Sequence, residues 1–267
     1  MRRERCDRSL EAGLTIWEIP VGGQGFWQLP PDEVHLWRLG LELPDEALEG
    51  LLEALSADER KRSGRFRFGR ERRRYVACRA ALRKLLGGYM QSDPAQLELR
   101  YGRQGKPFLN LEGTWPLKFN LAHSHELALL AFAHGRELGV DLEWMRPLDD
   151  ANAIAERFFS VDERTAFQAL EPADRTAGFY RCWTRKEAYL KATGGGLVGR
   201  LEHFTVQFAA GQTAALLWAA DDDPVRWTMT GLEPAAGYAG ALVVEGYDWR
   251  LLARDFRWDL VSHREIP

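Results

Sequence analysis

The sequence contains little cysteine, no long apolar run and almost no excess of charge of either sign. Its three cysteines, Cys6, Cys78 and Cys182, have the spacing of neither a metal site nor a disulfide framework, so we expect a reducing, cytoplasmic environment. The longest apolar run, residues 127–133, is far shorter than the ~20 residues that a membrane span needs. A net charge of −3 gives no overall reason to expect nucleic acid. These features argue against a disulfide-stapled or membrane-spanning protein.

What the sequence does contain is ordinary for a globular chain: hydrophobic residues make up 45% and charged residues 28% of its 267 residues. This composition excludes an intrinsically disordered or fibrous chain. At roughly 150 residues per domain, the length predicts one large domain or two small ones. Glycine and proline interrupt residues 1–32, which we expect to form an irregular arm. The remainder divides into an N-terminal half, 33–136, and a C-terminal half, 137–267.

The two halves share an order of elements. Each contains a helix-capping box followed by Arg, with the sequence SADER at residues 56–60 and SVDER at residues 160–164. After the first box we predict a long helical stretch that stops at Gly87-Gly88, and after the second a long helix at about 174–193. Because capping boxes are common, two unrelated helix caps are the alternative to a duplication.

Strands complete each half. The predicted strands are 34–43, 97–101, 116–121, 126–133 and 137–144, and then 204–208, 214–218, 225–232 and 238–244. We therefore predict an α+β fold, a pseudo-dimer of two similar α+β halves. The cleft between such halves is a preferred place for a ligand, and we place the active site there.

Two acidic residues share one face of the predicted strand 137–144. Alternate side chains of a strand lie on the same side, so Asp141 and Glu143 point one way while Val140 and Leu142 point into the core. Neighbouring carboxylates repel each other unless a cation lies between them, and hard oxygen ligands suit Mg²⁺. A solvated acidic edge strand is the simpler interpretation of this pair alone.

The predicted helix 174–193 carries Trp183, Glu187 and Lys191 at intervals of four residues, and therefore on one face. The simpler interpretation is an anchoring Trp beside a Glu–Lys pair that slightly stabilises the helix. The functional hypothesis makes Glu187 a third metal ligand or a general base, with Lys191 beside it to hold a phosphate.

Two further segments carry groups that suit an anion. His123, in the segment Phe119-Asn-Leu-Ala-His-Ser124, can act as a cation or donor toward phosphate, although a lone His is more often a structural hydrogen-bonding residue. The loop from Gly102 to Pro107 contains glycine and Lys106, so its N–H groups and the ammonium can surround an anion. This loop is not a Walker A motif.

A basic run is the largest local anomaly of charge. Between Arg60 and Lys84 there are twelve Lys or Arg and a single acid, Glu71. Apolar residues from Val76 to Leu85 predict that the helix is packed and amphipathic. Its cationic side is a solvated face in the simplest interpretation, and otherwise meets polyphosphate, an acidic protein or nucleic acid.

Taken together and in this order, these segments resemble the Sfp-type 4′-phosphopantetheinyl transferases. The resemblance runs from about Val34 to Phe208. It depends on Arg62-Ser-Gly-Arg-Phe66, Arg74, Gly105-Lys106-Pro107, Phe119-Asn-Leu-Ala-His123-Ser124, Gly139-Val-Asp-Leu-Glu143 and Trp183-Thr-Arg-Lys-Glu-Ala-Tyr-Leu-Lys191. The last two motifs are the family's most specific signature.

The resemblance implies an enzyme that transfers the 4′-phosphopantetheine group of coenzyme A to a serine of an apo acyl or peptidyl carrier protein. Mg²⁺ is the implied cofactor, and adenosine 3′,5′-bisphosphate is the implied second product. Such carriers belong to fatty-acid, polyketide or nonribosomal-peptide synthesis. We expect a cytoplasmic monomer with no nucleic-acid and no membrane partner.

By position in the motifs, the resemblance assigns Asp141, Glu143 and Glu187 as Mg²⁺ ligands, and Glu187 with Lys191 as the catalytic pair. The implied coenzyme A contacts are Arg62, Arg74, Lys106, Pro107, Asn120, His123 and Lys191.

The sequence departs from the family pattern at three places. Ala122 stands where relatives often have Ser, so one hydroxyl contact to coenzyme A is missing or is replaced by a backbone N–H. Glu59 stands where relatives often have a basic residue, which makes Arg62 a less direct assignment than Lys106 or His123. Residues 1–32 have no counterpart in the compact members of the family.

The implied chemistry needs a base, because a serine hydroxyl must lose a proton before it attacks phosphorus. Glu187 is the candidate, directly or through a metal-bound water, although a carboxylate held tightly by Mg²⁺ is a weaker base.

Two other classes of protein are alternatives to the transferase. A nucleic-acid-binding module is favoured by the basic run and opposed by the net charge. A Mg²⁺-dependent phosphohydrolase would use the same acids without a protein acceptor.

Overall fold

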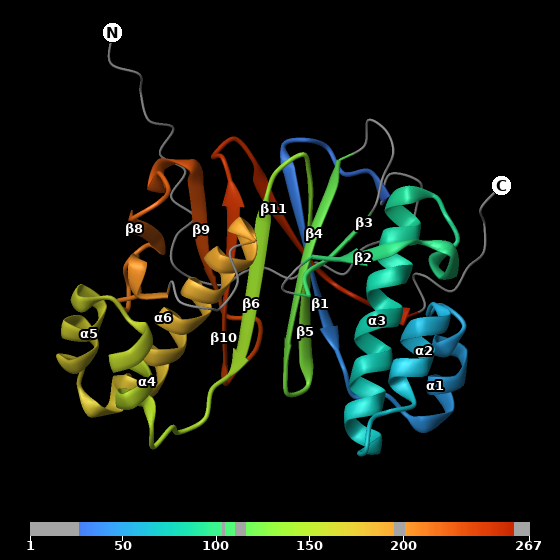
Figure 1. Ribbon diagram of the computed structural model, residues 1–267, viewed down its shortest axis with the longest axis horizontal. Coiled ribbons are helices and arrows are strands. Elements are labelled where there is room, and N and C mark those ends of the chain that lie inside the picture. The colour runs from blue at the N-terminus through green and yellow to red at the C-terminus, as the bar shows by residue number, and fades with distance from the viewer. Residues whose placement is uncertain (1–26, 103–104, 110–115, 195–200, 259–267) are drawn as a thin grey trace, which may run out of the picture.

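The structure is a computed structural model that describes residues 27–102, 105–109, 116–194 and 201–258 (Figure 1). The helices are α1 Asp45–Leu52, α2 Ala57–Ser63, α3 Gly69–Met90, α4 Ala151–Phe158, α5 Val161–Gln168 and α6 Pro172–Thr193. The strands are β1 Glu33–Gly40, β2 Leu99–Tyr101, β3 Pro107–Leu109, β4 Leu117–Ser124, β5 Leu127–His134, β6 Leu138–Trp144, β7 Phe204–Gln207, β8 Ala215–Ala219, β9 Trp227–Leu232, β10 Tyr238–Glu245 and β11 Arg250–Asp255.

Two main sheets occupy the centre of the molecule. One has the strand order β11-β1-β5-β4 and the other β6-β10-β9, while β2-β3 and β7-β8 form small two-stranded sheets. Helix α3 packs on the first main sheet and helix α6 on the second, at opposite sides of Figure 1. A buried cluster that includes Leu36, Val140 and Leu242 joins the two sheets. The predicted α+β fold with two similar halves is confirmed, and β4 and β6 lie where the halves meet.

Both capping boxes form as predicted. The Ser56 hydroxyl accepts a hydrogen bond from the Glu59 backbone N–H at 3.3 Å, and the Glu59 carboxylate accepts one from the Ser56 N–H at 3.1 Å. Ser160 and Glu163 repeat the arrangement at 3.3 and 2.8 Å. Each pair satisfies two helix N–H groups that have no partner within the helix.

The two boxes share a second contact that the sequence pattern alone did not reveal. Glu59 also accepts a hydrogen bond from Arg83 on α3, and Glu163 accepts one from Lys186 on α6 at 2.6 Å. Each glutamate is buried and therefore ties its short capped helix to the long helix of the same half. The same unusual buried pair in both halves supports a duplication over two unrelated caps.

The predicted end of the first long helix is wrong. Helix α3 continues through Gly87-Gly88 and ends at Met90, and the C-cap residue Gln91 has a φ of +50°. A Cβ atom at Gly88 would collide with the Trp27 ring. These glycines therefore allow close packing against the helix and do not stop it. The helical stretch is also interrupted after Ser63, so that α2 and α3 are separate helices.

One strand absent from the sequence prediction changes how the halves connect. Strand β11 pairs in parallel with β1, in a register that runs from Glu33↔Arg250 to Arg38↔Asp255. An ion pair of 2.7 Å between Arg38 Nε and Asp255 Oδ1 holds this edge. The end of the second half therefore completes the sheet of the first, across the proposed boundary at 136/137. Helix α4 was likewise not predicted.

The predicted arm falls mostly outside the described residues, because only residues 27–32 of it are described. In that part Leu29 is buried in the core of the first half, and the Trp27 ring packs against Gly88. In the described part of the chain, no helix has the length and apolar character needed to cross a membrane.

Candidate active site

A cavity of about 380 Å³ lies between the two halves. The first half contributes Arg62, Lys106 and His123 to its wall, and the second half contributes Glu187 and Lys191. The other lining residues are Tyr75, Cys78, Arg79, Tyr101, Gly105, Pro107, Asn120, Leu121, Leu190 and Gly194. The cavity therefore gathers most of the predicted coenzyme A contacts around the predicted catalytic pair.

A glycine brings the acidic strand against the catalytic helix. A Cβ atom at Gly139 would collide with the backbone of Ala188 and Ala192 on α6. Only glycine allows β6 to approach α6 this closely. The close crossing places Asp141 of β6 beside Lys191 of α6, which explains why glycine precedes the acids in this motif.

Asp141 is buried and bound to a lysine of the other element. Lys191 Nζ donates to Asp141 Oδ1 at 2.7 Å and to the Val140 carbonyl oxygen at 3.2 Å. The second oxygen, Asp141 Oδ2, is buried and has no hydrogen-bond partner. The predicted orientation of Asp141 away from the apolar face of β6 is confirmed, because Val140 and Leu142 lie in the core between the sheets.

Glu143 is held by a hydroxyl instead of an ammonium. Ser124 Oγ donates to Glu143 Oε2 at 2.8 Å. Burial raises the pKa of Glu143, and the negative charge of Asp141 adds to the effect, while the Ser124 hydrogen bond lowers it. Ser124 is part of the His123-Ser124 motif, but no role was predicted for it from the sequence.

Glu187 differs from both other acids. Its Oε1 atom is buried with no hydrogen-bond partner. Burial raises the pKa of Glu187 to about 7, and the charges of Asp141 and Glu143 act in the same direction against the opposing charge of Lys191. The predicted shared face is confirmed for Glu187 and Lys191, whereas Trp183 packs against Phe158 and Phe179.

The acidic cluster consists of Asp141, Glu143 and Glu187, whose charges influence one another. It has the character of a cation site that is incomplete without another ligand. Among the described residues, no group of three or more His, Cys, Asp or Glu is already arranged to hold a metal ion. Mg²⁺, however, is usually bound by one or two carboxylates together with substrate phosphates and water. Two unpartnered buried oxygens, on Asp141 and Glu187, supply hard donors of this kind. The residues therefore fit a divalent cation that a phosphate ligand completes.

Two residues of the first half connect it to the acidic strand. Lys106 Nζ donates to the carbonyl oxygens of Lys191 at 2.6 Å and Leu138 at 3.2 Å. Asn120 Oδ1 accepts a hydrogen bond from the Val140 N–H at 3.0 Å. An ammonium has three N–H donors, so Lys106 keeps one for a ligand in the cavity. Both residues join the two halves as well as lining the cavity.

The remaining predicted contacts differ in their positions. His123 lines the cavity, and burial together with nearby Lys191 and Arg79 lowers its pKa. Arg74 does not line the cavity and instead donates to Glu42 Oε1 from Nε at 2.9 Å and from Nη2 at 2.7 Å. Arg74 is therefore the one predicted coenzyme A contact that does not line the cavity.

One part of the cavity wall, aromatic and cationic, was not predicted from the sequence. The Arg79 guanidinium lies 5.5 Å from the Tyr101 ring centroid and donates to the Tyr101 hydroxyl. Arg79 Nε also lies 3.4 Å from Glu59 Oε1. Arg79 belongs to the basic run, so its charge was visible in the sequence, but its direction into the cavity required the helix position.

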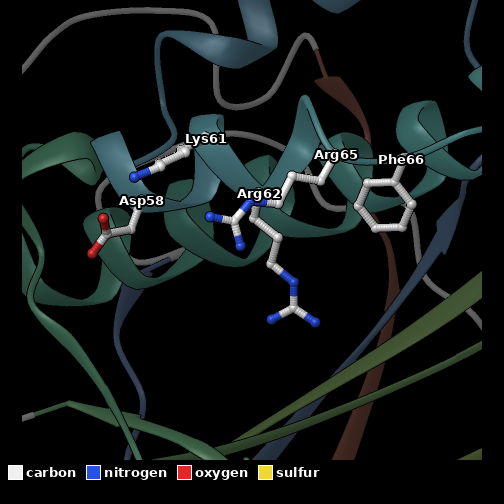
Figure 2. Close-up of a pocket in the computed structure, with 5 residues that line it drawn as sticks. All are labelled: Asp58, Lys61, Arg62, Arg65 and Phe66. Atoms are coloured by element: carbon white, nitrogen blue, oxygen red, sulfur yellow. The ribbon is translucent and has the colours of Figure 1, made fainter.

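A second, more open cavity of about 640 Å³ adjoins the first through Arg62, which lines both. Figure 2 shows its residues on α2 and the segment after it: Asp58, Lys61, Arg62, Arg65 and Phe66. Lys61, Arg62 and Arg65 are exposed there, whereas Arg79 and Arg83 of α3 are buried and paired with Glu59. Part of the basic run is therefore buried and paired with Glu59, and three of its exposed members border the second cavity.

Family comparisons cover both halves of the chain. Residues 44–134 match the family model described as "4′-phosphopantetheinyl transferase, N-terminal", and residues 137–243 match that of the "4′-phosphopantetheinyl transferase superfamily".

Individual relatives extend over most of the chain. It is 40% identical over 220 residues to 4′-phosphopantetheinyl transferase HetI of Nostoc sp., which covers 82% of this chain and 90% of that protein. It is 31% identical over 191 residues to 4′-phosphopantetheinyl transferase psf-1 of Bacillus pumilus, covering 70% and 78%. A solved structure, holo-[acyl-carrier-protein] synthase of Thermotoga maritima, aligns with 43% of this chain and 64% of its own length at 22% identity and a TM-score of 0.33.

Proposed function

The chain belongs to the 4′-phosphopantetheinyl transferase superfamily, and from this premise we propose how its cavity and acidic cluster carry out the transfer. It is a 4′-phosphopantetheinyl transferase, and enzymes of this family act on carrier proteins with coenzyme A as the substrate. The finer proposal is that the acceptor is a serine of an apo acyl or peptidyl carrier, that the reaction depends on Mg²⁺, and that adenosine 3′,5′-bisphosphate is released.

We assign coenzyme A to the cavity between the halves. Its phosphates carry negative charge, and Arg62, Lys106 and His123 line one wall. Pro107 and Asn120 line the same wall and are proposed as further contacts. Arg74 stays a proposed contact only if it leaves its ion pair with Glu42, which the exposed position of that glutamate allows.

Mg²⁺ would be held by Asp141, Glu143 and Glu187 together with the pyrophosphate of coenzyme A. When bound, it would neutralise charge on the leaving phosphate. The observation that carries this assignment is a pair of buried, unpartnered oxygens, Asp141 Oδ2 and Glu187 Oε1. Glu187 lines the cavity, and Asp141, which does not line it, is connected to it through Lys191, which does. Burying such oxygens without a partner is costly, so a ligand that satisfies them is expected.

Glu187 is the proposed general base. Lys191 donates a hydrogen bond to Asp141, and Ser124 donates one to Glu143. Glu187 has a buried oxygen without a hydrogen-bond partner and is fixed by neither kind of donor. A base with a pKa near the working pH combines the ionised form with the ability to accept a proton. The serine proton passes to Glu187 as the serine oxygen bonds to phosphorus and the pyrophosphate P–O bond breaks. Lys191 offsets the negative charge that develops nearby.

We also propose a cytoplasmic monomer. One chain supplies the lining of the cavity from both of its halves, so the proposed reaction requires no second copy. Cys78 and Cys182 are buried free thiols, as a reducing compartment would leave them, and burial raises the pKa of each.

The test is intact-mass measurement of apo acyl and peptidyl carriers incubated with the protein and coenzyme A. With Mg²⁺ the carrier should gain one phosphopantetheine group, and an equal amount of adenosine 3′,5′-bisphosphate should appear by chromatography. EDTA should abolish both. Release of nucleotide without any carrier would instead favour a phosphohydrolase. Unmodified carriers, while a known transferase modifies them in parallel, would refute the proposed function.

A further inference from the structure

Ser124 occupies a bridging position in the acidic cluster. Its hydroxyl donates to Glu143 Oε2 at 2.8 Å and accepts a hydrogen bond from the Trp144 N–H at 3.0 Å. The Trp144 N–H therefore orients the hydroxyl, and the hydroxyl in turn fixes one oxygen of Glu143. A hydroxyl has one donor and two acceptor positions, so this arrangement uses its single proton for the carboxylate.

The bridge crosses from one half of the molecule to the other. Ser124 is the last residue of β4 in the first main sheet, whereas Glu143 and Trp144 end β6 in the second. Four residues earlier on both strands, Asn120 accepts from the Val140 N–H. Because the described parts of β4 and β6 form no backbone ladder, these two side chains take its place. The Ser124 side chain of the first half thus sets the position of the Glu143 carboxylate in the second half.

The turn after Ser124 holds this bridge in place. His125 has a φ of +52°, a left-handed conformation that is costly for a residue with a Cβ atom. Its ring stacks on Trp144 with centroids 4.3 Å apart and planes 23° apart. The Tyr238 hydroxyl accepts a hydrogen bond from the Glu126 N–H at 3.2 Å. These contacts offset the backbone strain and fix the end of β4.

We propose that Ser124 is the positioning residue of the acidic cluster: its hydroxyl holds Glu143 Oε2 and so fixes the orientation of the carboxylate that would serve as a ligand of a divalent cation. This inference rests on the proposed function, because it assumes that Glu143 is a ligand. Residues that orient a metal ligand through a hydrogen bond typically change metal affinity by about 10- to 100-fold when they are removed.

The three acids then have distinct supports. Asp141 is held by an ammonium, Glu143 by a hydroxyl, and Glu187 by neither. Removing the hydroxyl deletes no charged group from the cluster and takes away only the hydrogen bond to Glu143. Ser124→Ala is for this reason a cleaner test of positioning than any substitution of an acid.

The experiment measures Mn²⁺ binding, which the same oxygen donors support, in the presence of coenzyme A. Electron paramagnetic resonance of the free ion gives the dissociation constant. The variants are Ser124→Ala, Ser124→Thr and the control Thr228→Val. Thr228 is a half-buried strand residue of the same second sheet whose hydroxyl donates to the Gly246 carbonyl, away from the cluster.

The expected result is that Ser124→Ala raises the Mn²⁺ dissociation constant about tenfold or more. Ser124→Thr, which keeps the hydroxyl, should remain close to wild type, and Thr228→Val should leave binding unchanged. The Mg²⁺ concentration that gives half-maximal transfer should rise in Ser124→Ala, with kcat largely restored at excess Mg²⁺.

Two outcomes would overturn the inference. One is wild-type Mn²⁺ affinity in Ser124→Ala together with a lower unfolding temperature, because the bridge would then act only on stability. The other is equal weakening in Ser124→Thr and Ser124→Ala. If Ser124→Ala does not fold, Ser124→Cys, with a weaker donor of similar size, must give weakened affinity. Failure of the wild-type protein to bind Mn²⁺ with coenzyme A would refute the proposed metal site, on which this inference rests.

Discussion

Lys191 Nζ lies 2.7 Å from Asp141 Oδ1, at the point where helix α6 crosses strand β6. The chain therefore supplies its own cation to an acid that we propose as a metal ligand. Asp141 Oδ1 is taken by the ammonium, and Oδ2 is the buried oxygen without a partner. Oδ2 would therefore remain for a divalent cation while Lys191 holds Oδ1.

Replacing Lys191 should impair turnover without abolishing it. We expect Lys191→Ala to lower the single-turnover rate at saturating coenzyme A by about a hundredfold, because one electrostatic contact to the developing charge is lost. The matched control is Lys118→Ala, which removes an ammonium paired with Glu137 in a half-exposed ion pair. Such pairs contribute little, so the control should keep its rate. Equal rates in the two variants would show that Lys191 has no part in the reaction.

Gly139→Ala should damage both the fold and the site. The new Cβ atom would meet the backbone of Ala188 and Ala192 on α6, and forcing extra volume into a packed contact typically costs about 1–3 kcal/mol. The displacement of β6 should also weaken Mn²⁺ binding. Urea unfolding measures the first effect. Gly50→Ala on α1, where a Cβ atom would meet nothing within 4 Å, should be neutral or stabilising. If Gly139→Ala leaves both the urea unfolding and the Mn²⁺ binding unchanged, β6 and α6 move apart at no cost and their close approach is not required.

The period of each element predicted which side chains share a face, and the family resemblance implied that the two elements meet in one acidic cluster. Alternation along β6 placed Asp141 and Val140 on opposite faces of the strand, and the helical repeat placed Glu187 and Lys191 on one face of α6. The predictions that were wrong or missing depended on contacts between residues distant in sequence. Nothing local distinguishes a glycine that ends a helix from Gly88, which accommodates Trp27. Likewise, the pairing of β11 with β1 joins residues more than 200 positions apart, so neither strand's own pattern specifies it.

Lys106→Ala and His123→Ala should separate binding from stability. Both should raise the KM for coenzyme A with little change in kcat, because their proposed contacts are the same in the ground and transition states. Lys106 additionally bonds the carbonyl oxygens of Leu138 and Lys191, so its loss should also lower the free energy of unfolding by about 1–3 kcal/mol. His123→Ala lacks that cost. Steady-state kinetics and denaturant unfolding decide the matter. A fall in kcat at constant KM would contradict both assignments.

Stability should fall between pH 7.5 and 5 because of His35. Burial, with the nearby charge of Arg254, lowers the pKa of His35 from 6.5 to about 4. In the neutral ring Nε2 donates to Glu33 Oε2 at 3.0 Å, which leaves Nδ1 to accept from the Tyr89 hydroxyl at 2.6 Å. The unfolded chain takes up a proton as the pH falls below 6.5, while the folded chain does not until about pH 4. The predicted loss between pH 7.5 and 5 is about 2 kcal/mol.

Urea unfolding at the two pH values measures this loss. His35→Gln should be less stable at pH 7.5 but should lose less stability on acidification than the wild type. An equal loss in both proteins would show that other groups cause the pH dependence.

The most direct test of the central claim is the single-turnover transfer of phosphopantetheine to an apo carrier by Glu187→Gln, followed by intact mass at saturating coenzyme A and Mg²⁺. The substitution keeps the shape of the side chain and removes its charge and basicity. Because a proposed ligand and the proposed base are lost together, the rate should fall at least about a thousandfold while the unfolding temperature stays near that of the wild type. If Glu187→Gln retains even about a tenth of the wild-type rate, corresponding to about 1.4 kcal/mol, Glu187 is neither the base nor an essential ligand.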